Sequence, residues 1–174
     1  METNVRKFGT GEAVGMVVLT VLCIACFPVN PLVLTGLIEP GFYLPAFVAG
    51  WVVWAVGMVL VMAPIVLFPR RGGVGKGKSF VHTTRLVDTG LYAMVRHPQY
   101  LGGVLAIFVT TPLLYPHWAF IAMGIPGIVL LYVSTRLEDI YLVQQFGDAY
   151  VAYMQRVPRM DLPRGIIRFL RRRR

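Results

Sequence analysis

The chain has 174 residues and a formal net charge of +9, and 56% of its residues are hydrophobic. Its mean hydropathy of +0.66 excludes an ordinary soluble domain. Uncharged runs of 26, 30 and 39 residues separate Glu12 from Glu39, Glu39 from Arg70, and Arg96 from Arg136. Each run exceeds the roughly 20 apolar residues that cross a bilayer as a helix, so we predict an all-α integral membrane protein.

The first two uncharged runs predict two transmembrane helices. The first covers residues 13–37, where Pro28 and Pro31 are expected to end or kink the helix. The second covers residues 42–68, with a bend expected at Pro64. The linker between them contains no Lys or Arg, and we expect the first helix to be retained rather than cleaved as a signal peptide.

Two motifs in this half resemble functional sites, a nucleotide phosphate loop and a metal or redox cysteine pair, but neither has the sequence context that such a site needs. Residues 72–79 read GGVGKGKS and match the phosphate loop G-x-x-x-x-G-K-[ST], with Lys78 and Ser79 in the chemical positions. A phosphate loop joins a buried strand to a helix, whereas this string follows a membrane span, so we interpret it as a linker. Cys23 and Cys26 lack a second cysteine pair, and we expect packing residues rather than a metal or redox site.

The third uncharged run is too long for one crossing. Residues 97–135 as a single helix would extend about 58 Å at 1.5 Å per residue. A break at Tyr115–His117 predicts a third span over 98–114 and a fourth over 117–136. A shorter amphipathic helix over 137–155 is expected to lie at the membrane interface, although a fifth crossing there stays open.

The positive charges predict the orientation. All 17 Lys and Arg residues lie in the N-terminal arm, in residues 70–96, or from Arg136 onward. Four spans place these three regions on one side, which is the cytosolic side of an inner membrane, with both termini. The basic tail 164–174 is expected to lie on anionic lipid headgroups. Because this topology accounts for the net charge, no nucleic-acid partner is expected.

The residues around the start of the third span indicate a binding site. Pro98 disfavours helical geometry at His97 and suits the first turn of a helix. The free amides of that turn, with Arg96 and His97, favour an anion at the membrane surface. Tyr92 and Tyr100 add aromatic faces that can stack on a base.

An acidic pair follows the fourth span. A hairpin of the third and fourth spans brings Glu138 near His97, which makes one site of two separate signals. Glu138 is expected either to pair with Arg96 or to accept hydrogen bonds from the hydroxyls or ammonium of a ligand. Asp139 also needs a partner if it is partly buried. The segment 146–158 is expected to lie over the site.

Two strings, LVDTGLYAMVRHPQYLGG and LEDIYLVQQFGDAYVAYMQRVP, carry a family resemblance. Over about residues 80–160 the sequence resembles the isoprenylcysteine carboxyl methyltransferases and, more broadly, the membrane phospholipid methyltransferases. The resemblance implies S-adenosylmethionine as methyl donor and a lipid or prenylated substrate that arrives from the membrane. By position, the cofactor contacts would be Thr84, Arg85, Leu86, Val87, Tyr92, His97, Pro98, Gln99, Tyr100 and Glu138.

The predicted spans and the resemblance together divide the chain, and two arginines are expected to act on the substrate. Transmembrane helices 1 and 2 would occupy 1–69, a cytosolic loop 70–90, and a catalytic subdomain 91–174, with the hairpin over about 98–136. The eukaryotic relatives place a substrate-facing Arg one helical turn before the glutamate, where this chain has Ser134. Arg96 and Arg136 are therefore the residues expected to orient the carboxylate of an acceptor.

Two other classes remain open at the level of the sequence. Membrane sterol-type reductases have a similar C-terminal layout and an R-H-x-x-Y-like signature, with NADPH in the equivalent pocket. A non-catalytic membrane lipid-binding protein is the second alternative. Thermal stabilisation by S-adenosylmethionine or its homocysteine product, by NADPH, or by neither distinguishes the three.

Overall fold

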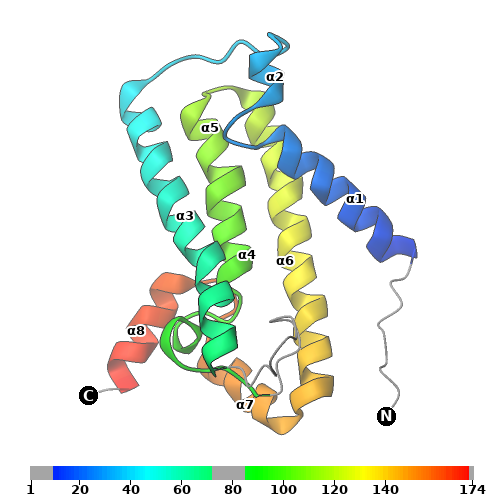
Figure 1. Ribbon diagram of the computed structural model, residues 1–174, viewed down its shortest axis with the longest axis vertical. Coiled ribbons are helices and arrows are strands. Elements are labelled where there is room, and N and C mark those ends of the chain that lie inside the picture. The colour runs from blue at the N-terminus through cyan, green and yellow to red at the C-terminus, as the bar shows by residue number, and fades with distance from the viewer. Residues whose placement is uncertain (1–9, 72–84, 173–174) are drawn as a thin grey trace.

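The computed structural model describes residues 10–71 and 85–172, and every element in these ranges is helical (Figure 1). In chain order the elements are α1 (Thr10–Ala25), α2 (Pro31–Leu34), α3 (Leu44–Arg71), η1 (Gly90–Ala93), α4 (Pro98–Gly103), η2 (Val104–Val109), α5 (Thr110–Leu114), α6 (Trp118–Phe146), α7 (Asp148–Arg156) and α8 (Leu162–Arg172). The predicted all-α class is confirmed for the described residues. Thr84 and the string 72–79 lie outside them.

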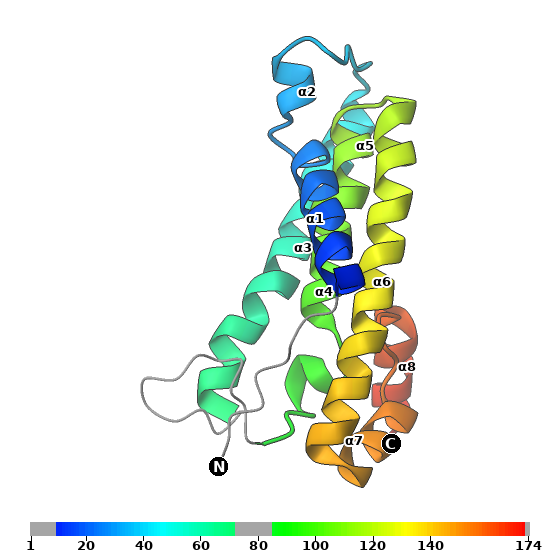
Figure 2. The ribbon, with the colours of Figure 1, turned by 90° about the vertical axis from the view of Figure 1, so that its right-hand side faces the viewer.

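Three helical rods run side by side along the bundle, and α1 packs beside α6 (Figures 1 and 2). The central rod runs from Pro98 to Leu114, because the π-helix η2 joins α4 to α5. It packs against α3 on one side and α6 on the other. Figure 1 shows α2 at one end of the bundle and α7 and α8 at the opposite end.

The central rod and α3 touch through glycines. A Cβ added at Gly102 would lie 2.6 Å from the carbonyl oxygen of Gly57, and one added at Gly57 would lie 2.8 Å from that of Gly102. Small residues of this kind let two helix backbones approach closely, which is the common packing device of membrane helices. The start of the central rod, and with it the neighbouring His97, is thereby fixed against α3.

The first predicted span is wrong in its extent. Helix α1 ends at Ala25, and the chain then turns before the short α2. The buried Asn30 stabilises this turn, because its Nδ2 donates to the Ala25 carbonyl at 2.6 Å and its Oδ1 accepts from the Leu32 amide at 3.0 Å. The helix thus stops before Pro28, as proline chemistry predicts, and residues 13–37 are not one continuous helix.

The predicted boundary after residue 136 is also wrong. Helix α6 continues to Phe146 and ends at Gly147, whose φ of +58° suits glycine. Its 29 residues extend about 43 Å, which exceeds the roughly 30 Å of hydrocarbon in a bilayer. We therefore expect the last turns of α6 to reach beyond the apolar layer, where a helix can carry charged residues without breaking. The short amphipathic helix predicted over 137–155 therefore starts later, as α7 at Asp148.

Two helices of the described chain are long and apolar enough to cross a membrane. They are Leu44–Ala63, within α3, and Trp118–Phe146, which is α6, with mean hydropathies of 2.2 and 1.8. Large apolar side chains on these helices face outward, as a lipid-facing surface requires: Val48, Val52, Val59, Ile121, Ile125 and Val129. The predicted count of four to five spans and the cytosolic orientation stay predictions.

Candidate active site

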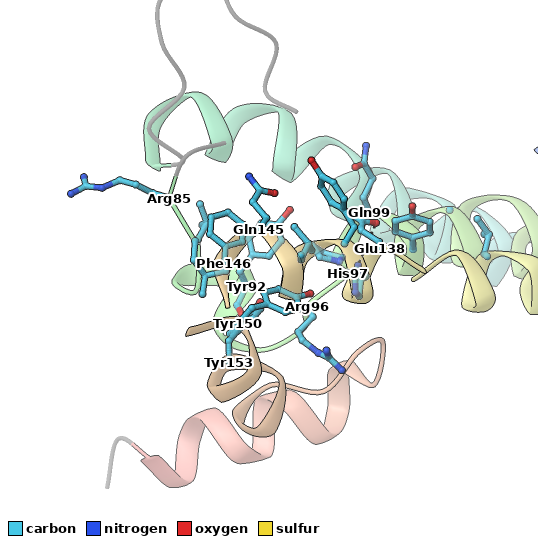
Figure 3. Close-up of a pocket in the computed structure, with 18 residues that line it drawn as sticks. Arg85, Tyr92, Arg96, His97, Gln99, Glu138, Gln145, Phe146, Tyr150 and Tyr153 are labelled. Atoms are coloured by element: carbon cyan, nitrogen blue, oxygen red, sulfur yellow. Dashed lines mark hydrogen bonds and ion pairs between the residues drawn. The ribbon is translucent and has the colours of Figure 1, made fainter. Parts of the chain in front are cut away.

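A cavity of about 480 Å³ opens at the end of the bundle that carries α7 (Figure 3). Nearly all site residues that we predicted from the sequence line this cavity: Arg85, Leu86, Val87, Tyr92, Arg96, His97, Pro98, Gln99, Tyr100 and Glu138. Thr84 lies outside the described residues. Arg136 does not line the cavity, because its guanidinium packs over the Tyr132 ring, 5.3 Å from the centroid.

The rest of the wall comes from residues that the sequence did not nominate. Helix α6 contributes Leu131 and, because it continues past Arg136, also Tyr141, Leu142, Gln145 and Phe146, while α7 contributes Tyr150 and Tyr153. The aromatic spacing in the segment 146–158 suggested a covering helix, but not which side chains would face inward. The cavity is thus walled by the motif loop on one side and by α6 and α7 on the other.

Backbone contacts fix the position of His97. Its amide donates to the Arg159 carbonyl at 3.1 Å, and the Arg96 amide donates to the Pro158 carbonyl at 3.0 Å. Pro98 opens the central rod directly after it. The imidazole, held between this rod and the segment that follows α7, is only 3% exposed.

The imidazole of His97 and the carboxylate of Glu138 share one site, as predicted. His97 Nδ1 lies 3.7 Å from Glu138 Oε2. This oxygen is buried and accepts no hydrogen bond within the part of the chain that the structure describes. A buried carboxylate oxygen without a donor is costly, so it is a ready acceptor for a ligand in the cavity.

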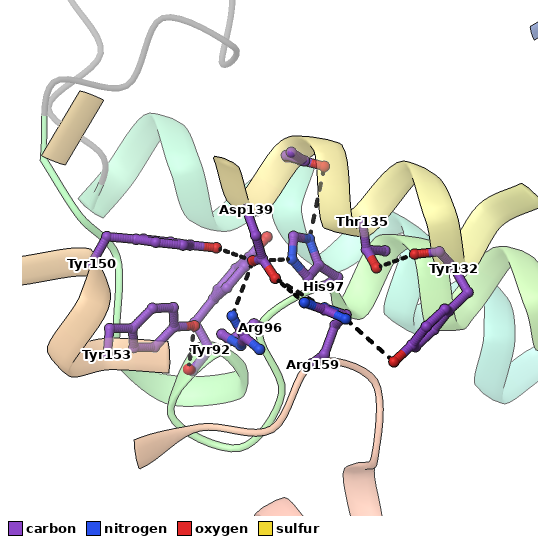
Figure 4. Close-up of polar contacts among 10 residues, drawn as sticks. Tyr92, Arg96, His97, Tyr132, Thr135, Asp139, Tyr150, Tyr153 and Arg159 are labelled. Carbon is purple, nitrogen blue, oxygen red and sulfur yellow. Dashed lines mark hydrogen bonds and ion pairs between the residues drawn. The ribbon is translucent and has the colours of Figure 1, made fainter. Parts of the chain in front are cut away.

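Asp139 is the centre of a polar network that the sequence did not specify (Figure 4). Its Oδ1 accepts from Arg96 Nη1 at 3.0 Å and from the Tyr150 hydroxyl at 2.7 Å, and lies 2.8 Å from His97 Nε2. Its Oδ2 accepts from Arg159 Nε at 2.9 Å. Of the two alternatives for Glu138, pairing with Arg96 is therefore wrong, since Arg96 pairs with the neighbouring Asp139.

The network also sets which nitrogen of His97 carries a proton. A carboxylate accepts hydrogen bonds and donates none, so the contact with Asp139 requires a hydrogen on Nε2. Nδ1 is then the ring nitrogen that faces Glu138 and the cavity. Asp139 thus orients the imidazole, and Glu138 is left to contact a ligand.

The two tyrosines of α7 fasten that helix over the site. The Tyr150 hydroxyl donates to Asp139, and the Tyr153 hydroxyl donates to the Tyr92 carbonyl at 2.7 Å. Burial raises the pKa of Tyr150 and Tyr153, and the Asp139 carboxylate raises that of Tyr150 further. Burial, with the Glu138 charge, also raises the pKa of Tyr92. All three stay protonated donors at neutral pH.

The fold and the site define a helical membrane protein with a tyrosine-walled cavity at one end of its bundle. The model of the phospholipid methyltransferase family matches residues 45–149, and the chain belongs to this family.

Curated relatives agree with the family. The chain is 36% identical over 96 residues to a protein-S-isoprenylcysteine O-methyltransferase of Schizosaccharomyces pombe, covering 49% of this chain and 39% of the relative. It is 29% identical over 126 residues to protein-S-isoprenylcysteine O-methyltransferase B of Arabidopsis thaliana, covering 67% and 62%. It is 28% identical over 112 residues to a methanethiol S-methyltransferase of Pseudomonas deceptionensis, covering 62% and 41%. The chain thus spans less than two thirds of each relative, and no solved structure matches it significantly.

Proposed function

We propose that this chain is an S-adenosylmethionine-dependent methyltransferase of the membrane that methylates the carboxylate of a lipid. The observation that carries the proposal is the buried Glu138 oxygen, which faces the cavity without a donor, 3.7 Å from His97. The two sequence strings that resemble the family meet in this cavity. Its volume of about 480 Å³ suits a cofactor, since small-molecule sites measure roughly 300–1,000 Å³.

The residues of the cavity fit S-adenosylmethionine by their chemistry. Glu138 can accept from an ammonium or from ribose hydroxyls, and the aromatic and apolar side chains of Tyr92, Tyr100 and Phe146 suit an adenine. When bound, the cofactor supplies an electrophilic methyl group on a sulfonium. The protein then needs to align the acceptor and exclude water, and a carboxylate acceptor needs no general base because it is already ionised.

The acceptor is proposed from the relatives and the cavity together. Two relatives are named for isoprenylcysteine and one for methanethiol, so apolar acceptors that carry a carboxylate or a thiol are the class to test. Of the two arginines predicted to orient the acceptor, only Arg96 lines the cavity, and it already contacts Asp139. Arg136 contacts Tyr132 outside the cavity, so neither arginine is assigned to the acceptor.

The location of the site is proposed from charge. The cavity lies at the end of the bundle with α7 and α8, where the described arginines concentrate. The positive-inside rule then makes this end cytosolic in an inner membrane, and it puts the basic tail on anionic headgroups.

Binding of the cofactor product by a matched pair of variants tests the proposal. We expect S-adenosylhomocysteine, titrated by calorimetry into the detergent-purified protein, to bind the wild type, and NADPH not to bind. Glu138→Gln removes the charge at constant shape and should weaken binding about tenfold or more, because a hydrogen bond to a charged group contributes roughly 1.5–3 kcal/mol. Asp148→Asn, an exposed acid outside the cavity, is the control.

Equal affinity of Glu138→Gln and wild type for S-adenosylhomocysteine would rule out this site. Stabilisation by NADPH alone would favour a reductase instead. If the cofactor binds, transfer of a labelled methyl group to an S-prenylcysteine analogue or to an alkanethiol then separates the two acceptor chemistries.

A further inference from the structure

A second cavity, of about 540 Å³, shares Arg96 with the first and is otherwise lined by Tyr132 and by residues of the segment 158–168. Its wall carries four arginines: Arg96, Arg159, Arg164 and Arg168. Arg164 and Arg168 are four residues apart on α8 and so share a helix face. The acid in the wall is Asp161, whose Oδ1 accepts from the Arg164 amide at 2.9 Å and caps the start of α8.

The positive charge of this second cavity is not balanced. Asp139 is the one carboxylate that contacts both Arg96 and Arg159, at 3.0 Å and 2.8 Å, and it neutralises at most one of them. Neither Arg164 nor Arg168 forms an ion pair among the described residues. Guanidinium groups in the wall of one cavity repel one another, and an anion between them reduces this repulsion.

Arg96 provides a second, independent observation that points to a ligand here. Its side chain is 9% exposed, and its Nε is buried without a hydrogen-bond acceptor in the described part of the chain. In Figure 3 its guanidinium extends away from the neighbouring cavity residues, towards the segment before α8. A buried guanidinium N–H that donates to nothing favours an oxygen-rich ligand beside it.

We propose that the second cavity binds a phosphoryl anion between α8 and the Asp139 network. Guanidinium forks match phosphate oxygens in geometry, and several forks that converge on one group favour phosphate over a single carboxylate. Tyr132 in the wall, whose hydroxyl accepts from Arg159 Nη1 at 3.2 Å, adds a hydroxyl donor. The proposal does not depend on methyl transfer.

Two sources can supply this phosphoryl group: the headgroup of an anionic phospholipid or free phosphate. Helix α8 exposes Ile166, Ile167 and Leu170 beside its arginines, a composition that suits the membrane surface. Gly165 packs against the Met94 carbonyl, where a Cβ would overlap the backbone, so α8 is held close to the bundle. A headgroup beside α8 would therefore reach the cavity.

The test uses the full-length protein in detergent and inorganic phosphate, with sodium chloride at matched ionic strength as the reference. We expect phosphate to raise the melting temperature of the wild type. Arg168→Gln should raise the half-maximal phosphate concentration about tenfold, through loss of one charge-assisted contact. Arg171→Gln removes the same charge from the same helix outside the cavity, and should stay within about twofold of wild type.

A second arm identifies the source. The same proteins are melted in nanodiscs of phosphatidylcholine with or without phosphatidylglycerol. Stabilisation by phosphatidylglycerol that Arg168→Gln loses and Arg171→Gln keeps supports a headgroup, and the same pattern with phosphate supports the free ion. Equal losses in both variants, or no stabilisation by either probe, overturn the proposal. If Arg168→Gln does not fold, Arg164→Gln replaces it.

Discussion

Asp139 and Glu138 are neighbours in the sequence, yet the structure gives them different tasks. Adjacent residues of a helix point about 100° apart. Asp139 is 4% exposed and faces four donors, whereas the side chain of Glu138 is 39% exposed and reaches the cavity. The sequence predicted that His97 and Glu138 meet. Which acid pairs with Arg96 depends on the rotation of α6, and packing of the bundle sets that rotation.

The division of tasks predicts different phenotypes for the two acids. Asp139→Asn leaves Arg96 and Arg159 without their carboxylate, and should lower the free energy of unfolding by about 3 kcal/mol, the usual cost of breaking a buried ion pair. Glu138→Gln should leave the melting temperature nearly unchanged while it weakens cofactor binding. Thermal unfolding in detergent measures both. Equal destabilisation by the two variants would contradict the distinction.

The buried tyrosines predict a dependence of stability on alkaline pH. The pKa values of Tyr92, Tyr150 and Tyr153 are raised in the folded protein, so folding favours their protonated form. Their contribution is complete below the unfolded pKa of about 10 and is lost as the pH rises above it. Stability should therefore fall from about pH 10 upward.

Absorbance of tyrosinate measures the effect. In the folded protein three of the eight tyrosines should ionise later than in the unfolded chain, in which all eight titrate together. Tyr150→Phe should reduce the late group to two. If the titration curves of the folded and the unfolded protein superimpose, the raised pKa values of the three buried tyrosines are contradicted.

At the scale of elements, Pro28 and Pro98 were informative signals, whereas Pro64, Pro69 and Pro126 lie inside α3 and α6. Pro28 predicted an end of the first helix, and Pro98 marks the start of the central rod, as observed. The charged run from Arg136 to Asp139 led to the wrong prediction that the helix ends at residue 136, because such a run resembles the end of a membrane helix. The charges occur inside α6, since Asp139 is compensated by partners that are distant in the sequence. Such compensation is a tertiary effect that no local pattern contains.

Adjacent glycines offer a matched test of the contact between α3 and α4. Gly102→Ala forces a Cβ against the Gly57 backbone and should destabilise the protein by about 1–3 kcal/mol. Gly103→Ala meets only the Leu131 side chain at 3.8 Å, and should be neutral or slightly stabilising because alanine favours helix. Thermal unfolding of the two variants compares them, and similar melting temperatures would refute the close packing.

At the scale of the molecule, the charge distribution predicts orientation. In a background in which Cys23 and Cys26 are replaced by alanine, Gln155→Cys lies on α7 and Thr35→Cys lies at the opposite end. A membrane-impermeant maleimide should label position 155 in inverted inner-membrane vesicles and position 35 in right-side-out vesicles. Labelling of both positions from one side would contradict the predicted topology.

Beyond Pro126, helix α6 continues from outward-facing apolar residues such as Val129 to Glu138. A rigid rod of this length responds to a thinner or thicker bilayer by tilting, because hydrophobic mismatch costs free energy for each ångström. Any such tilt displaces the carboxylate at the far end of the same rod. We therefore expect acyl-chain length in the surrounding lipid to affect the geometry of the cavity, so that the host membrane would help to set the affinity of the site.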